Sequence, residues 1–232
     1  MSAPPAAPAR GPHALSLVAL AAVAAAYVRA IWFTPPEAVQ GYAQKILYVH
    51  APAAWVAFLA FGLTALAGAF WLFLKDPRLD RFAESSAEVG VVFTTAVLTT
   101  GPLWGRPIWG TWWTWDARLT LTLFLWFVYV GYLVLRGVIP EREQRARYAA
   151  VLGILGALLI PFIHLSVYLF RTLHPLPVVA RTDGPQMPPV MLITFFGCFA
   201  AFTLLYVAFV RARMALAAER DALEDAAVGG TA

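Results

Sequence analysis

Residues Trp104–Arg118 read WGRPIWGTWWTWDAR and separate two long apolar runs of the sequence. Five of the nine tryptophans of this 232-residue chain lie in the stretch. Gly105, Pro107 and Gly110 argue against a continuous helix, so we predict a connection at a membrane surface, where indole rings are buried while their N–H groups stay hydrated. One or two tryptophans would indicate simple anchoring, but five predict a rigid, apolar platform for a flat, apolar ligand.

The rest of the chain is apolar enough for an integral membrane protein, because hydrophobic residues make up 61% of it. A membrane-spanning helix requires about 20 mostly apolar residues, and six runs have that length. We therefore predict an all-α, polytopic membrane protein with six transmembrane helices and a tryptophan-rich outer loop. The expected spans are 14–34, 51–74, 84–103, 118–136, 148–170 and 189–210. The net charge of +4 is small and lies on the loops, which argues against nucleic-acid binding.

The predicted organisation is one membrane domain, residues 14–210, which includes the tryptophan-rich loop 104–117. Residues 1–13 are expected to be a disordered cytoplasmic leader, and residues 211–232 a cytoplasmic helical tail. The first apolar run has no convincing cleavage site, so we expect a retained helix rather than a removed signal peptide.

The distribution of Lys and Arg predicts the orientation in the membrane. With both termini in the cytoplasm, 11 of these 17 residues lie inside and five lie outside, as the positive-inside rule requires. The outer loops are then 35–50, 104–117 and 171–188, and the tryptophan stretch is the middle one.

Two histidines flank the tryptophan stretch on this outer side. His50 ends the first outer loop, and His174 lies in the third, before a proline-rich run. A flat apolar ligand with a central metal requires axial ligands, an apolar surface and cations for its acidic groups, and haem matches all three. Neutral imidazole is a common axial ligand. We therefore predict that His50 and His174 are the axial ligands of a haem iron, although either histidine taken alone would more simply be an ordinary cap or loop residue.

The remaining candidates surround these histidines. The predicted haem platform consists of Trp104, Trp109, Trp112, Trp113, Trp115 and Asp116. The arginine side chain suits carboxylates, so the candidate partners of the haem propionates are Arg106, Arg118 and Arg171. Asp116 also suits a simpler role at the start of the next helix, where a carboxylate stabilises the helix dipole.

Other polar residues carry weaker signals. His164 lies within a predicted span and is expected to be a hydrogen-bonded packing residue, and Glu88 is expected to face protein rather than lipid. Cys198 is the single cysteine, so no intrachain disulfide can form, and the sequence contains no CxxCH motif. The sequence matches no zinc-ligand spacing and has no phosphate-binding glycine loop, which argues against ATP hydrolysis by this chain.

Three segments together resemble a known family. WGRPIWGTWWTWDARLT is similar to the tryptophan-rich "WD" signature of haem-handling membrane proteins in cytochrome c biogenesis. LYVHAPAAW and PFIHLSVYLFRTLHP are similar to the histidine segments of the haem exporter protein C (CcmC) family of the bacterial cytochrome c maturation pathway. The resemblance covers nearly the whole chain and weakens only at the leader and tail.

The resemblance implies a haem-handling protein rather than an enzyme, located in the bacterial inner membrane. It implies that haem b binds non-covalently at the periplasmic face, with His50 and His174 as axial ligands and the tryptophan loop as platform. It also implies delivery of that haem to a membrane-anchored haem chaperone. The other implied partners are an ABC-type ATPase, a second membrane subunit and a small single-span subunit. The prolines that follow His174 are a departure from the family pattern.

Two other functions match parts of the sequence less well. A membrane b-type cytochrome that passes electrons would hold haem between facing histidines within the spans, but only His164 lies at that depth. A permease would require polar groups along a path, and ionisable residues in the spans are nearly limited to Arg29, Glu88 and His164.

Overall fold

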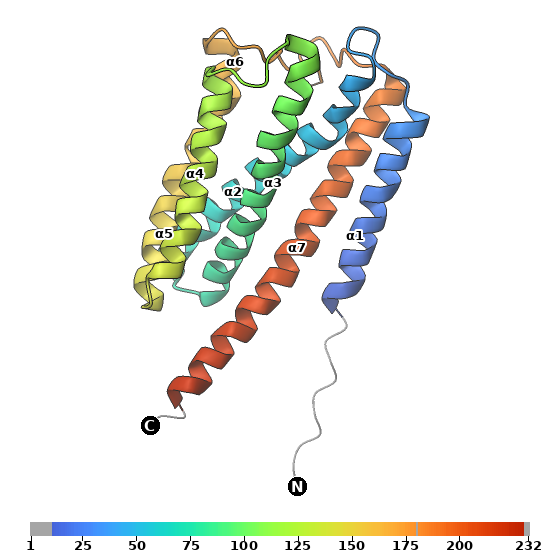
Figure 1. Cartoon of the computed structure of the whole chain (residues 1–232). Coiled ribbons are helices and arrows are strands. Elements are labelled where there is room, and N and C mark those ends of the chain that lie inside the picture. The colour runs from blue at the N-terminus through green and yellow to red at the C-terminus, as the bar shows by residue number, and fades with distance from the viewer. Residues whose placement is uncertain (1–10, 180, 230–232) are drawn as a thin grey trace.

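The structure is a computed structural model that describes residues 11–179 and 181–229. These residues form a helical bundle, as the apolar runs predict, and the only strand-like feature described is one isolated bridge between Glu37 and Gly41. The elements are α1 (Gly11–Val28), a π-helical turn η1 (Arg29–Phe33), a 3-10 helix η2 (Tyr42–Ile46), α2 (Leu47–Leu74), α3 (Pro77–Trp109), α4 (Ala117–Val138), α5 (Arg142–Ala157), α6 (Leu159–Leu169) and α7 (Pro189–Gly229). Figure 1 shows the long helices running side by side.

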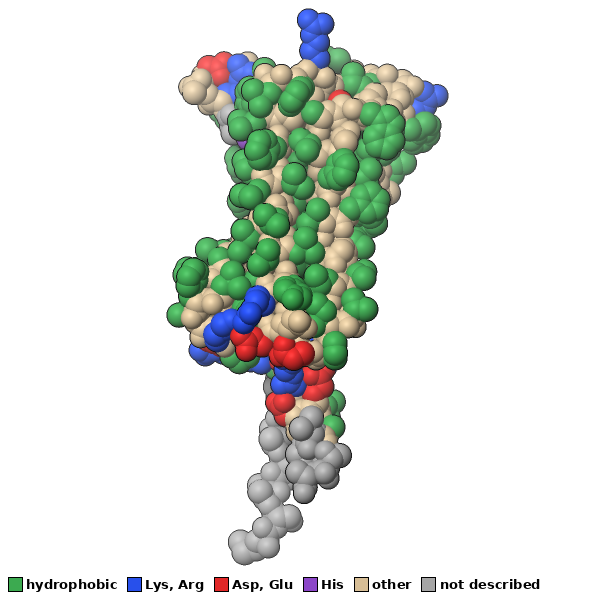
Figure 2. Space-filling model, turned by 90° about the vertical axis from the view of Figure 1, so that its left-hand side faces the viewer, with side chains coloured by type: hydrophobic (Ala, Val, Ile, Leu, Met, Phe, Trp, Pro, Cys, Tyr) green, Lys and Arg blue, Asp and Glu red, His purple; other side chains and the backbone are tan. Residues whose placement is uncertain are grey.

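Five helical segments in the described part of the chain are long and apolar enough to cross a membrane. They are Ala14–Phe33, Tyr42–Leu74, Ala117–Val138, Arg142–Leu169 and Pro189–Ala227. The third predicted span, 84–103, lies in α3, which packs extensively against α2 but begins with a charged segment and is not among the five. Figure 2 shows hydrophobic side chains over the middle of one face and charged side chains at its two ends, as expected for a bundle in a bilayer.

The fifth predicted span consists of two helices, α5 and α6, that follow each other at the left of Figure 1. They are separated at Leu158, which precedes Pro161 by three residues. Proline has no N–H group, so Pro161 cannot donate to the carbonyl of Ala157 and the hydrogen-bond ladder is interrupted there.

The ends of the chain correspond only partly to the predicted segments. Residues 1–10 of the predicted leader lie outside the described residues, and α1 already begins at Gly11. α7 is continuous from Pro189 to Gly229 and crosses the predicted boundary between membrane domain and tail without a break.

The centre of the bundle is held by an aromatic contact between α2 and α4. The rings of Phe61 and Tyr129 stack with centroids 3.7 Å apart, and the single hydroxyl proton of Tyr129 is shared between the carbonyl oxygens of Gly153 at 2.8 Å and Phe61 at 3.1 Å. Gly90 and Gly156 allow this close packing, because a Cβ atom at Gly90 would lie 2.4 Å from the Phe61 ring and one at Gly156 would lie 2.9 Å from the Tyr129 ring.

Ion pairs join the helices at the end where α3 begins. Arg136 of α4 has only 3% of its side chain exposed and binds Asp80 and Glu84 of α3 at 2.6 and 3.1 Å. Arg220 of α7 binds Glu84 at 2.8 Å. Glu88 pairs with Arg213 of α7, so it faces protein, as expected from the cost of exposing a carboxylate to lipid.

Candidate functional site

The two candidate histidines lie at the same end of the bundle, opposite these ion pairs. His50 belongs to the first turn of α2, and His174 lies in the connection between α6 and α7. In Figure 1 the start of α2, the end of α3 and this connection all lie at the top. His50 also interacts electrostatically with His174 and with Arg118. The prediction that His50 ends a loop is wrong, because η2 leads directly into α2 at Leu47.

The His50 imidazole packs against one turn of α3. Its Nδ1 lies 2.9 Å from the Thr100 hydroxyl, and its ring meets the Trp104 indole edge-on with centroids 5.8 Å apart. Gly101 completes the contact, because a Cβ atom there would lie 3.3 Å from His50 Cε1. Nε2 makes no hydrogen bond within the described part of the chain. One nitrogen of the ring is therefore engaged and the other is available.

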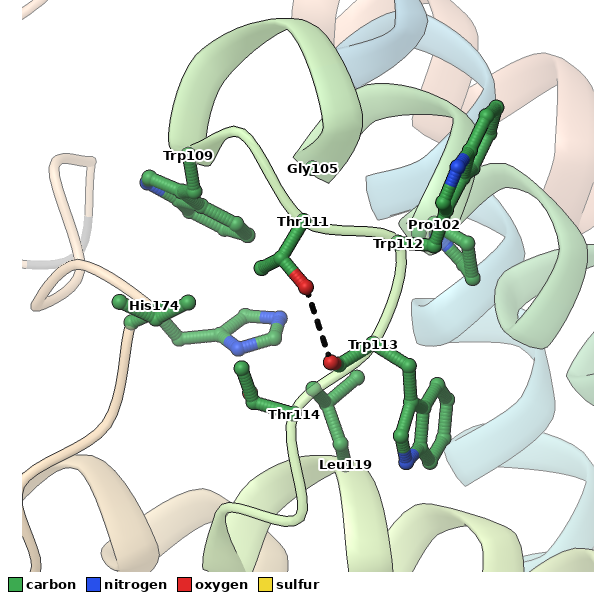
Figure 3. Close-up of a pocket in the computed structure, with 11 residues that line it drawn as sticks. Pro102, Gly105, Trp109, Thr111, Trp112, Trp113, Thr114, Leu119 and His174 are labelled. Atoms are coloured by element: carbon green, nitrogen blue, oxygen red, sulfur yellow. Dashed lines mark hydrogen bonds between the residues drawn. The ribbon is translucent and has the colours of Figure 1, made fainter.

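The His174 imidazole packs against Trp109 at the C-terminal end of α3. The two ring centroids are 5.6 Å apart, and Figure 3 shows the imidazole pointing between Trp109, Thr111 and Thr114. Its Nδ1 is enclosed and has no hydrogen-bond partner among the described residues. Burial, and then the positive charge of Arg118, lower the pKa of His174 from 6.5 to about 4, while Asp116 acts in the opposite direction. The ring is therefore neutral at physiological pH, the form that binds a metal.

A small cavity lies beside His174, lined by tryptophans of the 104–117 segment and by the end of α3 (Figure 3). Its volume is about 20 Å³, enough for about one water molecule. A porphyrin does not fit inside this cavity as it stands. A flat ligand could reach both histidines in two ways. Either the connection that carries His174 moves outward, or the ligand lies on the open side of the tryptophans.

The tryptophan segment is partly helical, so the prediction of a non-helical connection from Trp104 onward is wrong. α3 continues through Pro102 and Pro107 to Trp109. It ends at Gly110, whose φ of 77° favours glycine and whose N–H donates to the carbonyl of Arg106 at 3.1 Å. The non-helical part is therefore limited to the seven residues between α3 and α4.

The five indoles of this segment differ in exposure. Trp104 and Trp113 are half-buried, and the Trp104 Nε1 donates to Gln40 Oε1 at 3.1 Å. Trp109, Trp112 and Trp115 are 37%, 58% and 76% exposed. Trp115 contacts Trp113 edge-on with ring centroids 5.7 Å apart. The indoles whose rings contact the histidines are thus Trp104 and Trp109, whereas Trp112 and Trp115 are the two most exposed of the five.

Of the three candidate propionate partners, Arg118 carries a charge that acts on both histidines. It is half-buried, and none of the ion pairs found between described residues includes it. Arg106 instead binds the carbonyl of Gly110 and lies over the Trp112 ring, 6.0 Å from its centroid. Arg171 is exposed, and the described contacts do not place it beside either histidine.

Asp116 has the simpler of its two possible roles. It precedes α4 and caps it, accepting a hydrogen bond from the Leu119 N–H at 3.0 Å and another from the Thr114 hydroxyl at 3.1 Å. Its carboxylate therefore satisfies a backbone N–H group at the start of α4, where the tryptophan segment ends.

His164 differs from its prediction. It is exposed on α6 and has no hydrogen bond within the described residues, so it is not a hydrogen-bonded packing residue.

Sequence reasoning did not identify Thr100, Gly101 or Gln40, which contact His50 or Trp104. A threonine or a glycine within an apolar run carries no distinguishing signal, because both residues are frequent in membrane helices.

Comparison with known proteins is consistent with these observations. Residues 8–227 match the family model described as "Heme exporter protein C". "Heme exporter protein C" of Bradyrhizobium diazoefficiens is 39% identical over 173 residues, which cover 75% of this chain and 66% of that protein. The protein of the same description from Haemophilus influenzae is 36% identical over 81% of this chain and 77% of its own length. A "putative cytochrome c biosynthesis ccmC-like mitochondrial protein" of Marchantia polymorpha is 38% identical over 75% and 74%.

Proposed function

We propose that this chain, which belongs to the haem exporter protein C family of cytochrome c maturation, binds haem b non-covalently at the periplasmic face of the inner membrane. The observation that carries the proposal is the placement of His50 and His174 at one end of the bundle, against the same stretch of α3. Each ring has a nitrogen without a hydrogen-bond partner, and His174 is held neutral by its surroundings. Two neutral imidazoles can bind an iron from opposite sides.

The surrounding residues suit the other parts of haem. The half-buried indole of Trp104 and the partly exposed indole of Trp109 lie beside the histidines and supply flat apolar contact. Arg118 forms none of the ion pairs found between described residues, although Asp116 acts on it electrostatically, and its guanidinium suits a haem propionate. The cavity is too small to enclose the ring, so we propose that the connection around His174 moves outward and that one edge of the haem stays open to the outside.

An open haem edge suits transfer to another protein. We propose that a membrane-anchored haem chaperone docks over the exposed Trp112 and Trp115, since large exposed apolar patches mark interaction sites. Within cytochrome c maturation the chain would act beside an ABC-type ATPase, a second membrane subunit and a small single-span subunit. The excess of Lys and Arg at the opposite end supports an orientation with both termini in the cytoplasm.

Electron transfer by a membrane b-type cytochrome is less well supported. Such a protein would require histidines that face one another inside the bundle. His164, which lies within an apolar span, is exposed on α6 and does not face a second histidine in the described structure.

Docking and haem binding are expected to depend on different tryptophans. Replacing both Trp112 and Trp115 with alanine should reduce crosslinking of the chaperone several-fold and leave most haem bound, because the ring contacts of the histidines in the described structure are with Trp104 and Trp109, although Trp112 borders the cavity beside His174. Replacing Trp109 with alanine should instead lower haem content, because this ring packs against His174. Two quantities are measured for each purified variant: the yield of its crosslink to the haem chaperone, and its haem content.

The matched control is Trp55→Ala, which removes an equally large, exposed ring from α2 that is hydrogen-bonded to Thr203 of α7. It should leave both readouts as in the wild type. Undiminished crosslinking in the Trp112→Ala, Trp115→Ala variant would contradict the proposed docking surface.

A further inference from the structure

The hydroxyl of Thr100 connects α3 with the His50 ring of α2. Thr100 Oγ1 lies 2.9 Å from His50 Nδ1 and 2.7 Å from the carbonyl oxygen of Ala96 one turn earlier in α3. A hydroxyl has one proton to donate. A carbonyl oxygen can only accept, so the Thr100 proton is directed to Ala96, as is common for threonine in helices.

The direction of the second hydrogen bond follows from the first. With its proton directed to Ala96, the Thr100 oxygen accepts from His50, and the proton of the imidazole therefore resides on Nδ1. A neutral imidazole has a single N–H group. Nε2 is then the nitrogen with the free lone pair, and no described residue donates to it.

The same turn of α3 also fixes the plane of the ring. Gly101 has no side chain, which leaves room for His50 Cε1, since a Cβ atom there would lie only 3.3 Å away. Trp104 meets the ring edge-on at an interplanar angle of 69°. Three residues of one helical turn therefore determine the protonation, position and tilt of His50.

We propose that Thr100 is a positioning residue for haem, which holds the His50 ring in the tautomer and orientation that present Nε2 to the iron. The inference rests on the proposed function. It assigns the helical turn Thr100–Trp104 a role in ligand geometry that is separate from the tryptophan surface. His174 has no equivalent support, because its Nδ1 lacks a hydrogen-bond partner in the described structure.

The test compares haem binding by the wild type, Thr100→Val and Thr100→Ser in detergent. Valine keeps the shape of threonine and removes the hydroxyl, whereas serine keeps the hydroxyl. Loss of a hydrogen bond that orients a metal-binding histidine typically weakens metal binding about 10- to 100-fold. We expect Thr100→Val to lose haem to an excess of apomyoglobin at least about tenfold faster and to show a fraction of high-spin iron in its absorption spectrum. Thr100→Ser should restore both properties.

The matched control is Thr99→Val. Thr99 neighbours Thr100, is exposed, and makes the same kind of hydrogen bond to the carbonyl of Thr95, but does not contact His50. It should behave as the wild type. Gly101→Ala serves as a second variant, because the added methyl group presses on the His50 ring while the Thr100 hydroxyl remains. It should shift the spectrum in the same direction as Thr100→Val.

The outcomes separate this inference from the proposed function. If Thr100→Val and Gly101→Ala both match the wild type while His50→Ala loses its haem spectrum, His50 is a ligand and the role of Thr100 is overturned. If His50→Ala also keeps the wild-type spectrum, the ligand assignment itself fails, and the role of Thr100 fails with it.

Discussion

The variant carrying both His50→Ala and His174→Ala is expected to copurify with less than about a tenth of the haem found with the wild type, since a tenfold loss requires only about 1.4 kcal/mol of binding free energy. Both proposed axial ligands are then missing, and apolar contact with the indoles remains as the main interaction. His50 and His174 lie at one end of the bundle, and both pack against the C-terminal part of α3. The measurement is the haem content of the purified protein.

The matched control for this variant is His164→Ala. His164 is exposed on α6 and hydrogen-bonds to no described residue, so its replacement should leave haem content unchanged. A double variant that keeps full haem, or a His164→Ala variant that loses it, would contradict the proposed site.

Replacing Arg136 with alanine is expected to lower the free energy of unfolding by about 3–5 kcal/mol, the usual effect of removing one partner of a buried ion pair. The Arg136 side chain is 3% exposed and binds both Asp80 and Glu84. Its loss leaves Asp80 without its cation and Glu84 with Arg220 alone. The measurement is unfolding in mixed micelles, followed by circular dichroism.

The control for this prediction is Arg142→Ala. Arg142 also pairs with two carboxylates, Glu224 and Asp225, but its side chain is 44% exposed. Exposed pairs contribute about 0–1 kcal/mol, so this variant should unfold nearly as the wild type does. If the two substitutions lowered the free energy of unfolding equally, the burial of Arg136 would not determine how much its ion pairs contribute to stability. Haem binding by the folded protein should be unaffected in both variants, because these ion pairs lie at the opposite end from the histidines.

The helical architecture could be predicted from the sequence because each span is a long apolar run. The span in α3 is less evident from its sequence, because Asp80, Glu84 and Glu88 give the first half of this helix a polar face. The partners of these acids lie on α4 and α7. No local pattern indicates that these acids are paired with arginines more than 50 residues away.

The end of α3 shows why local rules mispredicted the tryptophan segment. Pro107 removes one backbone hydrogen bond from α3, and its ring crowds the preceding turn, at a cost of about 3 kcal/mol or more. Contacts outside the segment hold the helical conformation, among them Trp104 with His50 and with Gln40. The termination signal that the structure uses is Gly110 alone, whose positive φ ends the helix. Tertiary packing therefore overrides the local effect of Pro107.

The two histidines could be placed on one side of the membrane from topology, whereas the residues that orient them could not. Thr100 is one of four threonines in the apolar stretch before the tryptophans, and its partner His50 is 50 residues earlier. Which threonine faces His50 depends on how α3 is rotated against α2, and this rotation is set by packing such as that of Gly90 against Phe61.

The measurement that tests the central claim most directly is the absorption spectrum of the purified single variants His50→Gly and His174→Gly, with and without added imidazole. If one haem iron is bound by both histidines, the wild type shows six-coordinate low-spin haem, and each variant shows five-coordinate high-spin haem. Imidazole can occupy the space left by the missing side chain and should restore the low-spin spectrum in both. A variant that keeps the low-spin spectrum without imidazole would show that its histidine does not bind the iron.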